Sequence, residues 1–331
     1  MNTKRSRLPL LAAAAALGFC LTVQAADPIL VVGHSNPDTD SICSAIAVAQ
    51  LKSLQGVPAQ AIAQGQPNPE TRYVLETFKL AAPPVVNSVA GRQVFLVDHT
   101  DYPQAPADIK KADVVGFADH HKLGGLATDK PVEAWGAPVG ATGTVVTRMY
   151  DVAGVAIPKD VAGCLLATIV SDTVMFKSAT TTAQDKAAAE RLAKLAGVAD
   201  INALGLKVLE AKADIKGQTP AALLQRDLKT FDMSGKKVAV AQLELLSLAA
   251  VAPIKPELLG AMKDLKRDGY HSVFLMLTDT TQEATDLLFL SDDPAIVQTT
   301  WKVKPEGNSA WLPGVMSRKK QVIPPLEKTL K

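Results

Sequence analysis

The stretch that decides the fold is residues 29–45, ILVVGHSNPDTDSICSA. Its first five residues form an apolar run with the length of a buried strand. A polar loop follows, from His34 to Asp38, and apolar residues then recur at helical spacing from about Asp40. A buried strand that leads through a polar loop into a helix is typical of an α/β sheet.

The same alternation recurs further along the chain. Strands are predicted at residues 93–97 and 114–117, and they end in the polar pairs and triplets Asp98-His99 and Asp119-His120-His121. Helices are predicted at 141–153, 159–171 and 182–196. We therefore expect an α/β fold with a mostly parallel, doubly wound sheet, in which ligands bind beyond the carboxyl ends of the strands.

The pattern changes after about residue 202. A polar segment at 210–219, EAKADIKGQT, is predicted to be a linker, and strands at 237–244, 272–278 and 285–290 with a helix at 256–267 follow it. We expect a smaller α+β C-terminal domain at 220–331. The catalytic domain would occupy residues 27–209.

The first 26 residues have the features of a secretory signal peptide. Lys4, Arg5 and Arg7 precede an apolar run at 8–23, and small residues follow it, so cleavage is predicted near Ala25 or Ala26. The alternative is an uncleaved membrane anchor. Export to the periplasm is the prediction.

The formal net charge of +2 depends on the three basic residues of the leader, Lys4, Arg5 and Arg7. The remaining chain is therefore close to neutral, which argues against a nucleic-acid partner.

Beyond this leader the chain has two cysteines, Cys43 and Cys164, each within an apolar stretch. The favoured interpretation is two buried, small apolar residues. The alternative is a disulfide, which an oxidising compartment would permit.

Four of the five histidines lie in short motifs beside aspartates: His34 near Asp38 and Asp40, His99 after Asp98, and His120 with His121 after Asp119. A further motif, Ser171-Asp172-Thr173, ends an apolar helical run. Imidazole and carboxylate ligands without thiolate suit Mn²⁺ or Co²⁺, and Zn²⁺ is not excluded by ligand type. Such a set fits a dinuclear site in which one carboxylate bridges two cations.

Five segments together carry a family resemblance: GHSNPDTDSICSA, FLVDHTD, DHH, SDT and, near the C-terminus, SRKKQVIP. They resemble the family II (DHH-type, manganese-dependent) inorganic pyrophosphatases over essentially the whole chain after the leader. The first four segments occur in the wider DHH superfamily. The SRKKQ segment, at 317–321, is the more specific signal, because it resembles the C-terminal (DHHA2-type) domain of the pyrophosphatases.

The resemblance implies roles for individual residues. The first metal ion would be bound by His34 and Asp38, the second by Asp40, His120 and Asp172, and Asp98 would bridge both. A hydroxide held between two Mn²⁺ (or Co²⁺) ions would attack one phosphorus of pyrophosphate. Asp119 is expected to orient a neighbouring histidine.

The resemblance also implies which residues meet the substrate. His121 would contact phosphate or supply a proton, and His99 would act either catalytically or as a support behind the metal ligands. Lys229, Arg318 and Lys319 would neutralise the substrate, although Lys229 alone could be an exposed, solvated lysine. An additional Mg²⁺ would arrive with pyrophosphate, and a homodimer is expected.

Two alternatives remain at this stage. One is another DHH-superfamily phosphoesterase that acts on polyphosphate or on short or cyclic nucleotides in the periplasm, but the chain lacks the GGGH-type motif of the nucleotide-cleaving relatives. The other is a metal-binding protein without catalysis. Release of phosphate from different substrates would separate the three.

Overall fold

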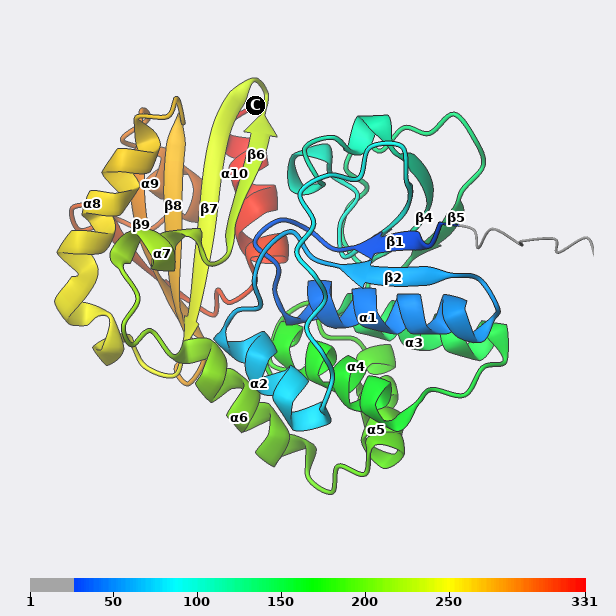
Figure 1. The fold of residues 1–331 in the computed structure, drawn as a ribbon. Coiled ribbons are helices and arrows are strands. Elements are labelled where there is room, and N and C mark those ends of the chain that lie inside the picture. The colour runs from blue at the N-terminus through cyan, green and yellow to red at the C-terminus, as the bar shows by residue number, and fades with distance from the viewer. Residues whose placement is uncertain (1–26) are drawn as a thin grey trace, which may run out of the picture.

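The structure, a computed structural model, describes residues 27–331 (Figure 1). The predicted signal peptide at 1–26 and its cleavage site lie outside the described residues. The chain forms two α/β units that lie side by side, each built around its own five-stranded sheet.

The N-terminal sheet is parallel throughout, as the sequence predicts. Its strand order is β2-β1-β3-β4-β5, and all four pairings are parallel. The strands are β1 (Ile29–Val32), β2 (Ala59–Ile62), β3 (Gln93–Val97), β4 (Asp113–Asp119) and β5 (Glu133–Gly136).

The two faces of this sheet are covered differently. Val31 and Phe95 belong to a core shared with α-helices, whereas Leu30 and Leu96 belong to a smaller core on the other face. That second face carries loops and two short 3-10 helices in place of α-helices. The helices are α1 (Thr39–Leu54), α2 (Pro69–Phe78), α3 (Thr142–Ala153), α4 (Lys159–Asp172), α5 (Ala183–Ala196) and α6 (Ile201–Ala213), and the 3-10 helices are η1 (Tyr102–Gln104) and η2 (Ile109–Lys111).

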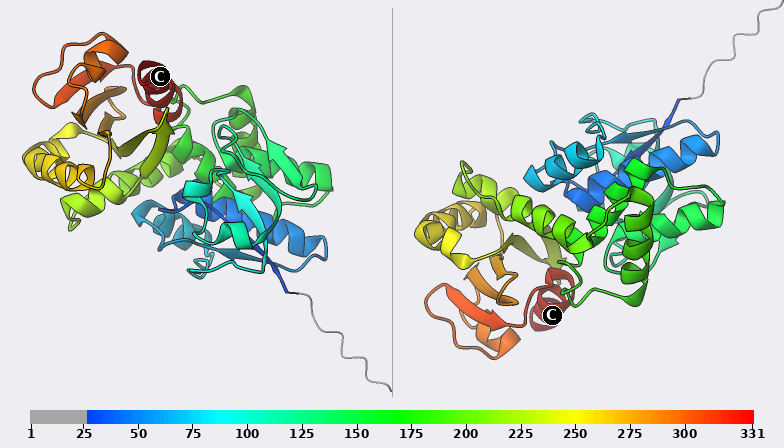
Figure 2. Two further views of the ribbon diagram at one scale, coloured as in Figure 1. Left: turned by 90° about the horizontal axis from the view of Figure 1, so that it is seen from above. Right: turned by 90° about the horizontal axis from the view of Figure 1, so that it is seen from below.

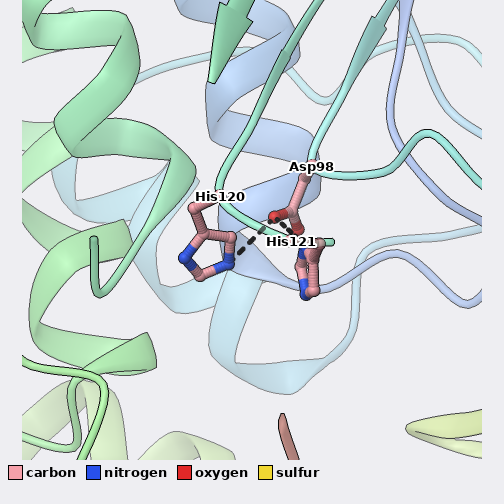
Figure 3. Close-up of side chains that lie close together, drawn as sticks. All are labelled: Asp98, His120 and His121. Atoms are coloured by element: carbon pink, nitrogen blue, oxygen red, sulfur yellow. Dashed lines mark ion pairs between the residues drawn. The ribbon is translucent and has the colours of Figure 1, made fainter. Parts of the chain in front are cut away.

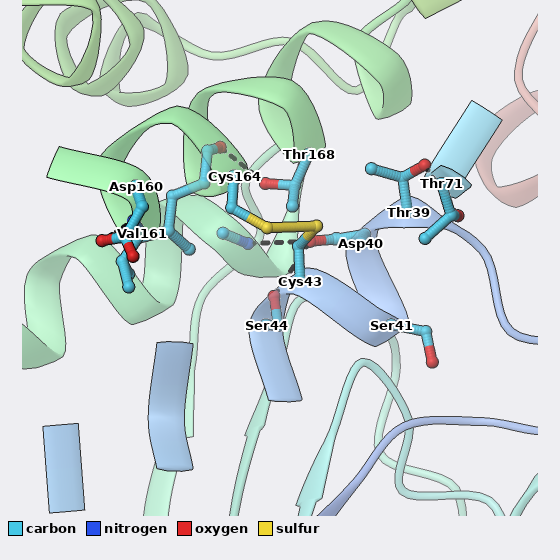
Figure 4. Close-up of a disulfide and its surroundings, with 12 residues drawn as sticks. Thr39, Asp40, Ser41, Cys43, Ser44, Thr71, Asp160, Val161, Cys164 and Thr168 are labelled. Carbon is cyan, nitrogen blue, oxygen red and sulfur yellow. Dashed lines mark hydrogen bonds between the residues drawn. A yellow bond between two sulfur atoms is a disulfide. The ribbon is translucent and has the colours of Figure 1, made fainter. Parts of the chain in front are cut away.

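A disulfide joins α1 to α4 through Cys43 and Cys164, which are both fully buried (Figure 4). The favoured prediction of two separate buried thiols is therefore wrong. The physical reason is the packing of α1 against α4, which brings the two Cα atoms to 5.7 Å, within the range that a disulfide spans. The sequence places the two cysteines 121 residues apart and could not show this contact.

The predicted linker is partly helical. Helix α6 continues to Ala213, because Leu204, Val208 and Leu209 are buried along one side of it. Only residues 214–219 form the irregular connection to the next helix.

The C-terminal unit contains a mixed sheet in the order β10-β9-β8-β7-β6, in which β7 and β8 are parallel and the other pairs antiparallel. Figure 2 shows its helices around the sheet. Its elements are α7 (Pro220–Gln225), β6 (Leu228–Met233), β7 (Lys236–Leu245), η3 (Leu248–Ala250), η4 (Ala252–Ile254), α8 (Lys255–Lys266), β8 (Ser272–Asp279), β9 (Ala284–Ser291), α9 (Ile296–Trp301), β10 (Ser309–Pro313), the π-helical turn η5 (Arg318–Val322) and α10 (Ile323–Thr329).

Across residues 27–331, none of the helices combines the length and the apolar character needed to span a bilayer.

Candidate metal centre

The six predicted metal ligands converge at the carboxyl end of the parallel sheet. His34 lies just beyond β1, Asp98 directly follows β3, and His120 directly follows β4. Asp40 lies in the first turn of α1, and Asp172 is the last residue of α4. Parallel strands end at one edge of the sheet, so residues far apart in the sequence meet there.

Local packing fixes the loop that carries His34 and Asp38. A Cβ atom on Gly33 would lie 1.9 Å from Ser41 Oγ, so only glycine lets this loop approach α1 so closely. Asp38 is the N-cap of α1, and its Oδ1 accepts a hydrogen bond of 2.9 Å from the Ser41 backbone N–H. Its second oxygen, Oδ2, remains free to face His34.

The first group of candidate ligands contains His34, Asp38 and Asp98. One ligand atom from each lies within 4.8 Å of the others. His34 Nε2 is 3.4 Å from Asp38 Oδ2 and 3.2 Å from Asp98 Oδ2.

The second group contains Asp40, His120 and Asp172, again with ligand atoms within 4.8 Å of one another. His120 Nε2 is 3.6 Å from Asp172 Oδ2 and 3.9 Å from Asp40 Oδ2. The same nitrogen is 3.5 Å from Asp98 Oδ1. Asp98 therefore presents one oxygen to each group, which is the arrangement of a bridging carboxylate.

The hydrogen bonds of the two histidines fit metal ligation. His34 Nδ1 bonds to the Ser35 carbonyl at 2.8 Å, and His120 Nδ1 bonds to the Val139 carbonyl at 3.0 Å. A carbonyl oxygen only accepts, so each Nδ1 must carry the proton. The two Nε2 atoms are buried and make no hydrogen bond within the described part of the chain. A fixed Nδ1–H with a free Nε2 lone pair is the usual state of a metal-binding histidine.

The carboxylates of the second group, Asp40 and Asp172, are buried close to other carboxylates and are repelled by them. Burial, together with repulsion from Asp98 and Asp38, raises the pKa of Asp40 well above its usual range. Burial and repulsion from Asp40 do the same to the pKa of Asp172. Divalent cations between these oxygens would relieve both effects, because opposite charge favours the ionised carboxylate.

His121 lies between Asp98 and Asp119 and contributes to the cavity beside the metal groups. Figure 3 shows His121 close to Asp98 and His120. Its Nδ1 is 2.9 Å from Asp119 Oδ1 and 3.6 Å from Asp98 Oδ1. Asp119 also accepts from the His121 backbone N–H at 2.9 Å. Asp119 thus orients His121, and within residues 27–331 it belongs to neither group of candidate ligands.

His99 lies behind the metal groups. Its Nδ1 bonds to the Val97 carbonyl at 2.9 Å, and its ring packs edge-on against His34 at 6.4 Å between centroids. Burial lowers the pKa of His99 to about 4. The side chain does not line the cavity described below. The structure thus brings His99 to the metal ligands but not to the space for a substrate.

A cavity of about 270 Å³ connects the metal groups to the C-terminal unit. Its walls include the candidate ligands Asp38, Asp98, His120 and Asp172 on one side, and Lys229, Arg318 and Lys319 on the other. The structure therefore brings all three predicted basic residues to the metal centre. Lys229 comes from β6, and the other two come from the turn η5.

Contacts hold two of these basic residues in place. The Arg318 guanidinium bonds to the Asp227 carboxylate at 2.9 Å and to the Asp227 carbonyl at 2.6 Å. Lys319 Nζ donates to the His120 carbonyl at 3.1 Å, across the boundary between the two units. Burial lowers the pKa of Lys319 to about 8 even though the Asp98 and Asp172 carboxylates oppose this shift.

Sequence reasoning missed two residues of the site, Asp227 and Thr142. Asp227 orients Arg318, and the Thr142 hydroxyl donates to Asp98 at 2.8 Å. The small-residue run 140–144, GATGT, at the start of the predicted helix is the one sequence feature that could have drawn attention to Thr142.

Two protein-family models match this chain. The profile of the DHH family, N-terminal domain, matches residues 28–169, and the profile of the DHHA2 domain matches residues 206–329. The first match includes five of the six candidate metal ligands, all except Asp172, and the second match includes Lys229, Arg318 and Lys319.

Similar proteins cover almost the whole chain. A protein of Archaeoglobus fulgidus named "Probable manganese-dependent inorganic pyrophosphatase" is 47% identical over 313 residues, which is 91% of this chain and 97% of the relative. The manganese-dependent inorganic pyrophosphatase of Methanothrix thermoacetophila is also 47% identical over 313 residues, with 92% and 99% covered.

A solved structure shows the same fold. The crystal structure titled "Crystal structure of Methanococcus jannaschii putative family II inorganic pyrophosphatase" superposes with a TM-score of 0.84 at 38% identity, covering 91% of this chain and 98% of that one. The buried aspartate and histidine groups, the two matched domains and these relatives lead to one conclusion. The chain belongs to the family of manganese-dependent (family II) inorganic pyrophosphatases.

Proposed function

We propose that this protein hydrolyses inorganic pyrophosphate to two phosphates at a dinuclear manganese site. The observation that carries the proposal is the composition of a single cavity, which has carboxylate and imidazole ligands on one wall and three basic side chains on the other. Carboxylates alone would repel a small, highly charged anion. Divalent cations and basic residues together attract it.

We assign one Mn²⁺ to His34, Asp38 and Asp98, and a second to Asp40, Asp98, His120 and Asp172. The distances in the structure support this assignment, since Asp98 Oδ2 faces His34 and Asp98 Oδ1 faces His120. Two bound metal ions would supply a nucleophile at neutral pH by lowering the pKa of a water molecule, and they would orient the substrate for in-line displacement.

The basic residues would bind the phosphate groups that the metal ligands cannot. Arg318 offers a planar guanidinium suited to two phosphate oxygens, and Asp227 holds it in place before the substrate arrives. Burial lowers the pKa of Lys319 to about 8, and a bound anionic substrate would favour its charged form. Lys229 is nearly buried and lines the same cavity, which argues against a simple solvated lysine.

His121 is the residue we assign to proton transfer or phosphate contact. Burial and the charges of Lys319 and Lys229 lower the pKa of His121 well below its usual range. A bound anionic substrate between these groups would oppose that shift and favour the protonated ring. We assign His99 to support of His34, since it lies outside the cavity lining.

An additional Mg²⁺ would accompany pyrophosphate, whose charge exceeds what the three basic residues neutralise.

We also propose a homodimer, as the family resemblance implies. The edge strand β5 has no second neighbour within residues 27–331 and could pair or pack with another copy.

Export to the periplasm through a cleaved signal peptide remains a proposal. The leader sequence supports it, and so does the disulfide between Cys43 and Cys164, because disulfides persist in oxidising compartments. Export would place the enzyme away from the biosynthetic reactions that release pyrophosphate.

Two assays at pH 7 with Mn²⁺, Co²⁺ or Mg²⁺ test the function: phosphate release from pyrophosphate and tripolyphosphate, and cleavage of a cyclic dinucleotide to linear nucleotides. We expect the highest kcat/KM with pyrophosphate and Mn²⁺ or Co²⁺. Higher kcat/KM on tripolyphosphate or the dinucleotide would favour a broader DHH phosphoesterase. An absence of pyrophosphate cleavage with every metal would refute the proposal, and metal binding without any hydrolysis would identify a metal-binding protein.

A further inference from the structure

The first turn of α3 contacts two metal ligands that come from different elements. The Thr142 hydroxyl donates to Asp98 Oδ1 at 2.8 Å, while the Thr142 backbone N–H donates to Asp40 Oδ2 at 2.6 Å. The Gly143 backbone N–H donates to Asp40 Oδ1 at 3.0 Å. Thr142 is fully buried, so these contacts are shielded from water. One residue thus touches both the bridging carboxylate and a carboxylate of the second group.

The hydrogen bonds restrict how Asp40 can bind a metal ion. A carboxylate offers about four lone-pair positions. Oδ1 of Asp40 accepts from Gly143 N–H and from Ser44 Oγ, the latter at 3.1 Å, and Oδ2 accepts from Thr142 N–H. The one remaining position is on Oδ2, the oxygen that faces His120. Asp40 is therefore arranged to bind through a single oxygen.

The Thr142 hydroxyl restricts Asp98 in a similar way. It bonds to Oδ1, the oxygen that faces His120, and leaves one lone pair of that oxygen for a metal ion. Rotation of the carboxylate toward either metal group would break this hydrogen bond. The contact therefore favours one oxygen on each metal over two oxygens on the same metal.

Packing behind α3 holds the turn in position. A Cβ atom on Gly143 would lie 1.9 Å from Thr168 Oγ1 of α4, so the turn presses directly on that helix. Asp185 of α5 accepts from the Gly140 N–H at 2.9 Å and from Thr144 Oγ1 at 2.6 Å. The turn thus has little freedom to move away from the ligands.

We propose that Thr142 is a positioning residue that sets the spacing of Asp98 and Asp40 for the second Mn²⁺. The inference rests on the proposed dinuclear site and extends it to a residue that binds no metal itself. Removal of the Thr142 hydroxyl would affect the first group only through Asp98, since no hydrogen bond joins Thr142 to His34 or Asp38 within the described residues.

Substitution of Thr142 by valine tests the proposal, because valine keeps the shape and the backbone N–H but removes the hydroxyl. Equilibrium dialysis of the full chain without substrate measures Mn²⁺ binding directly. We expect the affinity for the second Mn²⁺ to fall roughly 10- to 100-fold, as is usual for residues that support metal ligands. The affinity for the first should change less. Thr142→Ser retains the hydroxyl and should restore binding close to that of the unaltered chain.

The matched control is Thr147→Val, the same change at another buried threonine of α3. The Thr147 hydroxyl bonds to the Gly143 carbonyl at 2.8 Å and to no metal ligand, so both Mn²⁺ affinities should be unchanged. If Thr142→Val does not fold, as judged by circular dichroism, Thr142→Ala removes the hydroxyl without adding bulk.

Unchanged affinity for both Mn²⁺ ions in a folded Thr142→Val or Thr142→Ala variant would overturn the proposal, and so would an equal loss in Thr147→Val. Metal binding is measured without substrate, so this result is independent of whether the protein hydrolyses pyrophosphate. A failed hydrolysis assay would count against the proposed function and leave the role of Thr142 to be decided by dialysis.

Discussion

Asp98 lies between the two groups of candidate metal ligands, with one carboxylate oxygen facing His34 and the other facing His120. It lies at the end of β3 with a φ of +61°, in the left-handed region that few residues other than glycine, asparagine and aspartate adopt. Its backbone N–H donates to the Ala118 carbonyl at 2.9 Å, and its side chain accepts from Thr142. Such a backbone conformation persists where the surroundings hold it, which is common at functional sites.

Asp98→Asn should reduce turnover of pyrophosphate by about two or more orders of magnitude, because a neutral amide is a poor bridge between two cations. The fold should be retained, since the amide oxygen can still accept from Thr142. Steady-state kinetics and circular dichroism measure the two effects. Asp113→Asn, an exposed change at the opposite end of the same sheet, is the control. A fully active Asp98→Asn variant would show that another residue bridges the metals.

The six ligand candidates could be predicted because each motif stands where an apolar run ends. Thr142 and Asp227 could not. The contact between Thr142 and Asp98 joins residues 44 positions apart, and the contact between Arg318 and Asp227 spans 91 positions. A lone threonine or aspartate has many structural uses, so only the packing of α3 and η5 reveals these roles.

At the scale of elements, the strands that sequence patterns missed are the four at the sheet edges. β2 and β5 border the parallel sheet, and β6 and β10 border the mixed sheet. Edge strands are partly exposed and short, so they lack the continuous apolar run that identified β1, β3 and β8. The sequence consequently predicted the centre of each sheet and the ends that carry ligands, but not the width of either sheet.

Helices α1 and α4 carry one ligand of the second metal group each and are joined by the disulfide. Cys43 lies one helical turn beyond Asp40, and Cys164 lies about two turns before Asp172. The cross-link therefore ties together the two helices whose ends must stay close if Asp40 and Asp172 are to share a cation.

Replacement of both Cys43 and Cys164 by alanine should lower the free energy of unfolding. The loop that the disulfide closes spans 121 residues, for which loop-closure entropy predicts a loss of about 5 kcal/mol at most. Denaturant titration of the oxidised protein, compared with the Cys43→Ala, Cys164→Ala double variant, measures the difference. Full reduction of the unaltered chain should have a similar effect. Equal stability of the oxidised chain and the double variant would mean that the cross-link contributes nothing to the fold.

At the scale of the whole molecule, the cavity lies between the two units, and residues of both line it. Lys319 donates to the His120 carbonyl, and Lys320 donates to the Ala179 carbonyl at 2.8 Å. Lys122 and Glu327 form an ion pair of 2.5 Å between exposed side chains of the two units. We infer that separation of the units would remove the basic wall while leaving the metal ligands together, since all of those belong to the N-terminal unit.

Shortening the connection at 214–219, by deletion of Gly217 and Gln218, should therefore separate two properties. We expect kcat for pyrophosphate to fall, because Arg318 and Lys319 would no longer reach the metal centre correctly. Mn²⁺ affinity should be unchanged in equilibrium dialysis. Insertion of two glycines at the same place is the control. It makes the connection longer and more flexible, and so separates the effect of a shorter connection from that of any change in this segment. Loss of Mn²⁺ binding in the shortened variant would contradict the claim that the N-terminal unit alone holds the metal ions.

The disulfide has one more consequence, which concerns a chain that has lost its metal ions or its fold. The covalent ring closed by Cys43 and Cys164 contains Asp98, His120 and His121, while His34, Asp38, Asp40 and Asp172 lie within ten residues of its two ends. An unfolded chain so constrained samples fewer conformations, and more of those keep the ligand segments near one another. The cross-link thus keeps the ligand segments close together in the unfolded chain. We expect it to speed the reassembly of the metal site after the metal ions or the fold are lost.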